Sequence, residues 1–263
     1  MSIEDILKKI ASLQTGGESH FPPGLFPSYR SNKLIGYRRP DTNLFFSAIS
    51  AFTLQNLKPF IKEADQLAQI ETIKEKILQN YPAFQNKDGL KTYNFWRTKP
   101  TDHFSNGYIF KYFDHFRIPD DVDDTAMVYL TTNPTREDLH WLKEKLTLHA
   151  NGTRKWAKNT YSEYRELRAY STWFGKNMYI ELDACVLSNL LYCIYYYRLP
   201  FNQHDSDSLL YIRSIIESGR YKTEPFRCAH QYPRTALIIY HVARLIAAFD
   251  PLMLRRIKPE LIE

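Results

Sequence analysis

Two kinds of hydrophobic pattern along the chain predict two kinds of helix. In the first kind, apolar residues recur every three or four positions among charged ones, which predicts a helix with one buried face. This pattern covers residues 67–77, 139–146 and 209–216. In the second kind, apolar residues stand on nearly every side of the helix, over residues 43–54, 125–130, 185–197 and 236–249. Helices of the second kind must be covered by neighbours on several sides.

The alternation of these two kinds of helix predicts the architecture. A two-layer ring of helical hairpins encloses its inner helices and leaves its outer helices facing water. We therefore expect an all-α fold, a single α/α toroid over residues 1–263. Its first roughly 20–40 residues could form an extended arm, because chain ends are often poorly tied down. A globular bundle with a few central helices is the alternative that the periodicity leaves open.

Composition and charge exclude several classes of protein. Glycine contributes only 9 of 263 residues, which disfavours a glycine-rich β architecture. A net charge of +6 is too small for a nucleic-acid footprint, so we expect no nucleic-acid partner. Three cysteines are too few for a disulfide framework, and no apolar run reaches the length of a membrane span. We expect a cytoplasmic protein without a stable membrane span, and peripheral contact with a membrane stays open.

The densest acidic cluster, Asp120, Asp121, Asp123 and Asp124, stands where one of the apolar helices begins. One or two carboxylates at a helix start are common, because they cap free amides and favour the positive end of the helix dipole. Four carboxylates in so short a stretch repel one another, so at least one should hold a proton near neutral pH and be able to act as a general acid. If Asp124 or Thr125 caps the helix, Asp123 points inward and is that acid. A solvated capping turn is the alternative.

The stretch Asp121-Val-Asp-Asp-Thr-Ala126 resembles the Asp-x-Asp-Asp-Thr-Ala motif of class II terpene cyclases, the squalene-hopene and copalyl diphosphate type. In that family the motif opens an inner helix of an α/α toroid, and its middle Asp protonates an alkene or epoxide to start cyclisation. The resemblance implies Asp123 as the catalytic acid, with Asp121 and Asp124 as partners that hold and polarise it. Residues 173–190 are also similar to helices of bacterial prenyltransferase and squalene-cyclase-like toroids.

The resemblance implies a small hydrophobic or isoprenoid ligand. Aromatic faces stabilise a cation produced by protonation. The residues that we expect to contact the substrate are Asp120, Trp96, Trp173, Tyr232 and His230. The family's histidine partner for the acid has no local motif here, and His204, His230 and His241 are its candidates. His241 and Arg244 fall on one face of the last apolar helix, where we expect an interior polar pair.

Other functions stay open beside this one. Asp120 to Asp124 also fits the Asp-Asp-x-x-Asp magnesium motif of class I synthases, but Pro119 and Thr125 place the acidic cluster at a helix start. We therefore expect no cofactor, with magnesium as the alternative. The family's cyclases enclose their substrate between two toroids and this chain suffices for one, so a non-catalytic ligand-binding toroid is a second candidate. A toroid glycosidase that uses two carboxylates is a third. Four basic residues could receive a diphosphate or simply form a solvated turn: Arg30, Lys33, Arg38 and Arg39.

Overall fold

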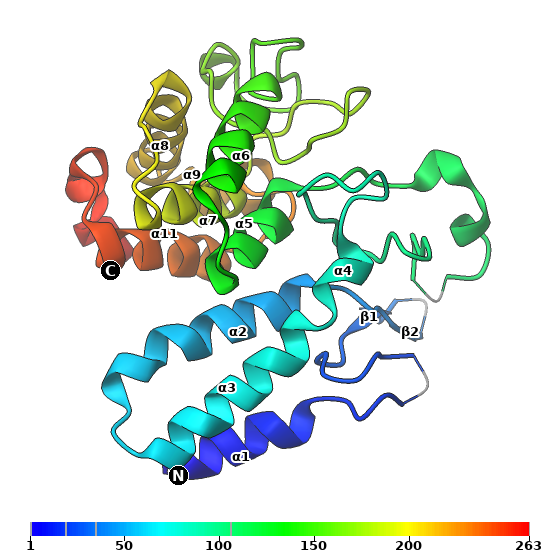
Figure 1. Ribbon diagram of the computed structural model, residues 1–263. Helices are drawn as coiled ribbons and strands as arrows, with labels where there is room; N and C mark the ends of the chain where they lie inside the picture. Colours follow the sequence, from blue (N-terminus) through cyan, green and yellow to red (C-terminus); the bar gives the residue numbers. More distant parts are fainter. Residues whose placement is uncertain (1, 19, 35, 106, 263) are drawn as a thin grey trace. The chain divides into compact units, whose positions relative to one another are not determined.

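The computed structural model describes residues 2–18, 20–34, 36–105 and 107–262. Over these residues the chain is mostly helical (53%) and includes a small two-stranded sheet (Figure 1). The prediction of a mostly helical protein is confirmed, and the ring arrangement stays a prediction. The chain divides into two compact units, Met1–Asp120 with Met127–Asn133, and Asp121–Ala126 with Pro134–Glu263. The expectation of one domain over the whole chain stays a prediction as well.

Three helices form the body of the first unit: α1 (Ile3–Leu13), α2 (Phe45–Leu57) and α3 (Ala64–Leu78). Helix α3 contacts both of the others and runs between them (Figure 1). Its apolar residues Ile70, Ile73 and Ile77 are buried, as the one-faced pattern predicts. The short helix α4 (Tyr81–Phe84) follows α3.

Along the chain, a β-hairpin follows α1 and precedes α2. Its strands, β1 (Tyr29–Asn32) and β2 (Tyr37–Pro40), pair antiparallel with Tyr29 opposite Pro40. In the part of the chain that the structure describes, the first forty residues thus contain a helix and a hairpin where the sequence left an extended arm open. Among those residues, no helix combines the length and the apolar character that crossing a bilayer requires.

The second unit contains the start of α5 (Val122–Thr131), then α6 (Arg136–Leu148), α7 (Ala184–Tyr196) and α8 (Gln203–Glu217). The helices α9 (Arg220–Thr223), α10 (Pro225–Cys228) and α11 (Thr235–Phe249) complete it. Helix α7 packs on both α8 and α11. Every residue from Ala184 to Ile194 is buried, as expected for a helix that is apolar on all sides.

Helix α11 departs from that expectation. Ile238, Val242 and Leu245 are buried, but Leu237 is 37% exposed and Tyr240 is 44% exposed. The prediction that α11 is covered on several sides is therefore wrong. Apolar side chains contribute much of any protein surface, so an apolar pattern alone does not require complete burial.

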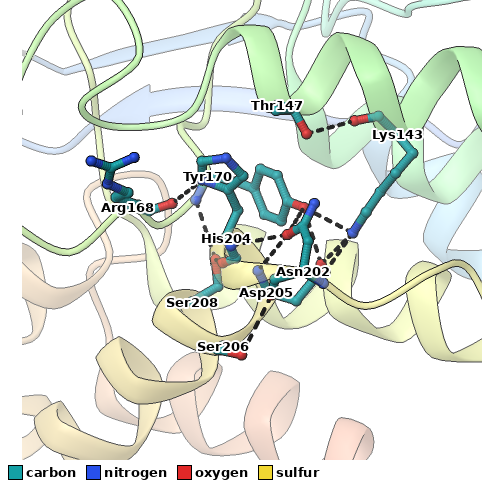
Figure 2. A network of polar contacts seen from close by, with 9 residues as sticks. All are labelled: Lys143, Thr147, Arg168, Tyr170, Asn202, His204, Asp205, Ser206 and Ser208. Carbon is teal, nitrogen blue, oxygen red and sulfur yellow. Dashed lines mark hydrogen bonds and ion pairs between the residues drawn. The ribbon is translucent and has the colours of Figure 1, made fainter.

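A buried ion pair joins α6 to α8 (Figure 2). Lys143 Nζ lies 2.6 Å from each carboxylate oxygen of Asp205, which is fully buried. Lys143 Nζ also donates to the hydroxyl of Tyr170 at 2.9 Å, and that hydroxyl donates to Asp205 Oδ1 at 3.1 Å. The side chain of Asn202 caps α8 by accepting from the backbone amides of residues 204 and 205. Both charges have partners, so this network is structural.

Candidate functional site

The acidic motif forms the first turn of α5. Asp121 precedes the helix, and its Oδ1 accepts a hydrogen bond from the backbone amide of Asp124 at 2.7 Å. Asp121 is therefore the capping residue, and the expectation that Asp124 or Thr125 caps the helix was wrong. The reason is a backbone contact that the local sequence does not show. Asp121 pairs with Trp173 in an antiparallel bridge, which holds it in the extended conformation that a cap requires.

Asp123 lies in the interior and is bound on both oxygens. Its side chain is buried, with the residue only 5% exposed. Asn189 Nδ2, on α7, donates to Asp123 Oδ1 at 2.5 Å, and the Tyr232 hydroxyl donates to Oδ2. These donors stand 66 and 109 residues away in sequence. The fold therefore assembles the surroundings of Asp123 from distant segments of the chain.

Two residues of α11 fix the orientation of the Asn189 amide. Arg244 Nη2 donates to Asn189 Oδ1, and His241 Nδ1 lies 2.9 Å from the same oxygen. A guanidinium has only donors, so the oxygen of the amide must face it and Nδ2 must face Asp123. His241 Nδ1 also lies 3.3 Å from Arg244 Nη2, but with its proton directed at Asn189 this longer contact is not a hydrogen bond. The predicted polar pair thus acts together on Asn189.

Burial controls the protonation of Asp123. It raises the pKa of this carboxyl to about 6, although the hydrogen bonds from Tyr232 and Asn189 and the charge of Arg244 lower it. Burial also lowers the pKa of His241 to about 3, and the charge of Arg244 adds to that effect. Asp123 is therefore poised to hold or release a proton near neutral pH, while His241 stays neutral.

Asp124 and Asp183 are two more buried carboxyls. Together with Asp121 and Asp123 they form what we call the acid cluster. Burial, followed by the charges of Asp121 and Asp123, raises the pKa of Asp124 well above its usual range. Asp124 Oδ1 is buried and has no hydrogen-bond partner among the described residues. Burial raises the pKa of Asp183 to about 7, although its backbone hydrogen bonds oppose the shift. The acid cluster thus retains protons that exposed carboxyls would lose.

Asp183 also has a structural task. Its Oδ1 caps α7 by accepting from the backbone amides of Cys185 at 2.8 Å and Val186 at 3.1 Å. Its Oδ2 accepts from the backbone amide of Gln231 at 2.8 Å. The residue after Gln231 is Tyr232, so Asp183 helps to hold the segment that carries the hydroxyl bound to Asp123.

The structure separates the five residues that we expected to contact the substrate. Tyr232 binds Asp123, and the backbone of Trp173 pairs with Asp121. His230 belongs to the same unit, where its ring packs edge-on against Phe226 with centroids 5.1 Å apart. The other two, Asp120 and Trp96, belong to the first unit.

In the first unit, Asp120 and Trp96 have their own partners. Asp120 Oδ2 accepts from the side chains of Asn86 at 2.5 Å and Thr92 at 2.6 Å. Trp96 Nε1 donates to Asp41 Oδ1 at 3.0 Å. The four aspartates that look like one cluster in sequence are thus divided between the two units after Asp120.

Neither a metal-ligand group nor a cavity is described at the acid cluster of the second unit. Over the described ranges, no three His, Cys, Asp or Glu side chains are grouped so that they could hold a metal ion, so the magnesium alternative gains no ligand set. The cavities described in this unit are lined by residues between 143 and 180, none of which belongs to the acid cluster. A ligand at Asp123 would have to occupy space other than these cavities.

Comparison with known proteins adds no relative. No protein-family model matches the chain, and neither does any curated protein or any solved structure. The resemblance to class II terpene cyclases therefore rests on residues 121–126, on the stretch 173–190 and on the helical character of the fold.

Proposed function

We propose that the second unit performs acid catalysis of the class II cyclase type, in which Asp123 protonates an isoprenoid alkene. The observation that carries this proposal is the state of Asp123. It is a buried carboxyl inside the motif, its pKa is about 6, and two distant donors hold both of its oxygens. A general acid needs a pKa close to the working pH, and burial brings Asp123 there.

The arrangement around Asp123 supports both halves of a proton transfer. In the transfer, the O–H bond of the Asp123 carboxyl breaks, the π electron pair of the alkene forms a new C–H bond, and a carbocation remains on the adjacent carbon. The carboxylate left behind keeps the hydrogen bonds from Asn189 and Tyr232 and the nearby charge of Arg244. Donors that are fixed before the reaction stabilise developing negative charge without rearranging.

A binding protein without catalysis is the second candidate, and the cavities described in the second unit leave it open. A catalytic acid must be within reach of its substrate, and none of these cavities is lined by Asp123. In that case the motif would stabilise the fold, and an isoprenoid would bind without being converted. The glycosidase alternative is favoured by no specific observation.

Product analysis separates these functions. The purified protein is incubated with squalene and with linear prenyl diphosphates, and the extracts are analysed by gas chromatography and mass spectrometry. Cyclised product from the wild type, reduced at least about a hundredfold in Asp123→Asn, would support the proposal, because positioned acids contribute on the order of 10²–10⁴ in rate.

A matched control removes a different buried carboxyl of the same unit. Asp207, on α8, accepts from the backbone amide of Arg168 at 2.7 Å and lies outside the acid cluster. The Asp207→Asn variant should form as much product as the wild type. Equal product from the wild type and Asp123→Asn would remove Asp123 as the acid. Binding of the same compounds without any product would favour the second candidate.

A further inference from the structure

The first unit contains a cavity that the proposed acid chemistry does not use. Its volume is about 550 Å³, within the range of pockets that bind small organic molecules. One side is formed by Arg30, Tyr37 and residues 39–41, from the hairpin and its end, and the other by residues 104, 105 and 107–110. The lining includes Arg30, Arg39, Asp41, Phe104, Tyr108 and Phe110.

Arg39 is held in the wall of this cavity by aromatic rings. Its guanidinium carbon lies 4.7 Å from the centroid of the Tyr37 ring and 4.6 Å from that of Tyr108. Gly107 lets the loop turn tightly beside Arg39, since an added Cβ there would lie 2.6 Å from the carbonyl oxygen of Phe104 and 3.3 Å from Arg39 Nη1. Stacking uses the faces of a guanidinium, while its N–H groups point outward in the plane. Arg39 is therefore placed in the way that recognition of a planar anionic group requires.

The charges that line the cavity leave a net positive charge. Arg30 Nη2 lies 3.3 Å from Asp41 Oδ2, and Asp41 Oδ1 accepts from the Trp96 indole. The lining thus holds two guanidinium groups, those of Arg30 and Arg39, and one carboxylate, that of Asp41. A cavity with this balance favours a ligand with one anionic group.

The rest of the wall is apolar and aromatic. Phe104 and Phe110 lie 5.7 Å apart, centroid to centroid. Tyr108 is 79% exposed and Phe110 is 53% exposed, so both rings have apolar surface that a ligand could cover. Aromatic side chains give large contact areas with flat unsaturated groups, to which burial of apolar surface adds.

We propose that this cavity binds an organic anion with a flat aromatic body. Arg39 holds the anionic group with Arg30 beside it, and the aromatic body lies against Phe104, Tyr108 and Phe110. The proposal goes beyond the acid chemistry of Asp123. It involves no residue of the second unit, so either proposal can fail without the other.

Calorimetric titration tests the ligand class on the full chain. Three probes divide the ligand into its parts: 1-naphthyl phosphate carries both the anion and the aromatic body, 1-naphthol lacks the anion, and inorganic phosphate lacks the body. We expect 1-naphthyl phosphate to bind at least about tenfold more tightly than either of the others, because a charge-assisted contact and apolar burial both contribute. Absence of binding, or equal affinity for inorganic phosphate, would overturn the proposal.

Two neighbouring arginines of β2 provide a matched pair of variants. Arg38 lies over the Tyr29 ring at 4.1 Å and is not part of the cavity wall. Arg39→Gln should weaken 1-naphthyl phosphate about tenfold, whereas Arg38→Gln, which removes the same charge, should change the affinity less than about twofold. Equal losses would show non-specific attraction and contradict a site at Arg39. Tyr108→Ala provides a second variant that should weaken the two naphthyl probes but not inorganic phosphate.

Discussion

The second unit buries carboxyl groups in two places that differ in their neighbours. Asp205 has the ammonium group of Lys143 2.6 Å from both oxygens. Asp123 has neutral donors on its oxygens, from Asn189 and Tyr232, and its charge adds to the burial that raises the pKa values of Asp124 and Asp183. At Asp205, one carboxylate is matched by one ammonium group. At Asp123, several carboxyls lie near one described guanidinium, that of Arg244.

This difference separates a structural carboxyl from a chemical one. A buried charge whose partner is also buried is stable only as a pair, so removing one member leaves an uncompensated charge. A buried carboxyl among other carboxyls can shed its charge by taking up a proton. Burial alone therefore does not identify a functional acid; the charge of its neighbours does.

The largest expected effect comes from breaking the matched pair. Lys143→Met leaves Asp205 buried without its cation and should lower the free energy of unfolding by about 3–5 kcal/mol. The double variant Lys143→Met/Asp205→Asn removes both charges and should recover more than half of that loss. Urea unfolding at neutral pH measures both variants. A single variant as stable as the wild type would show that the ion pair contributes little.

A smaller change in the free energy of unfolding, a gain instead of a loss, is expected when Asp123 is replaced. Its pKa is about 6 in the folded protein and has an ordinary value of 3.8 in the unfolded chain. Between these pH values the folded protein holds a proton that the unfolded chain releases, so the contribution of Asp123 to stability falls as the pH rises. Asp123→Asn removes that term. The variant should gain stability relative to the wild type from pH 4 to 6, by up to about 3 kcal/mol.

The quantity to compare is the difference in the free energy of unfolding between Asp123→Asn and the wild type at each pH. Burial lowers the pKa values of His149 and His241, which makes the stability of the wild type rise with pH and opposes the effect of Asp123. These histidines are present in both proteins and cancel in the difference. Ser188→Ala, a neutral change beside Asn189 on α7, is the control and should give a difference that does not vary with pH. A marked loss of stability in Asp123→Asn at neutral pH would assign Asp123 a structural role.

The smallest effect is expected from Tyr232→Phe. This variant removes one hydrogen bond to Asp123 and should lower the free energy of unfolding by about 1 kcal/mol. Because that hydrogen bond lowers the pKa of Asp123, its loss should raise the pKa further above 6. Carboxyl ¹³C NMR titration measures the shift. Tyr164→Phe, which removes the hydroxyl contact with Ser214, should leave the Asp123 titration unchanged.

The helices could be predicted because their signal is local. The apolar repeat of α3 and the uniformly apolar stretch of α7 each determine burial within a few turns. The exposed face of α11 could not be predicted, because an apolar pattern does not show which helices pack against it.

The candidate site could be predicted only in part. The motif pointed to Asp123, and His241 with Arg244 to a polar pair, because residues three or four positions apart share a helix face. That this pair orients Asn189, and that Asn189 in turn binds Asp123, depends on the packing of α7 against α11. The capping role of Asp121 depends likewise on its pairing with Trp173. Contacts between distant segments leave no spacing signal in a single sequence.

Helix α5 has a consequence for how the protein can be divided. Its first turns, residues 121–126, belong to the second unit, and residues 127–133 belong to the first. Neither unit is therefore a continuous stretch of chain, and no single cut yields two complete fragments. A fragment that begins at residue 134 would lack Asp123, and one that begins at residue 121 would carry seven residues that belong to the first unit. Truncated forms of this protein should accordingly be judged by which half of one helix they lose.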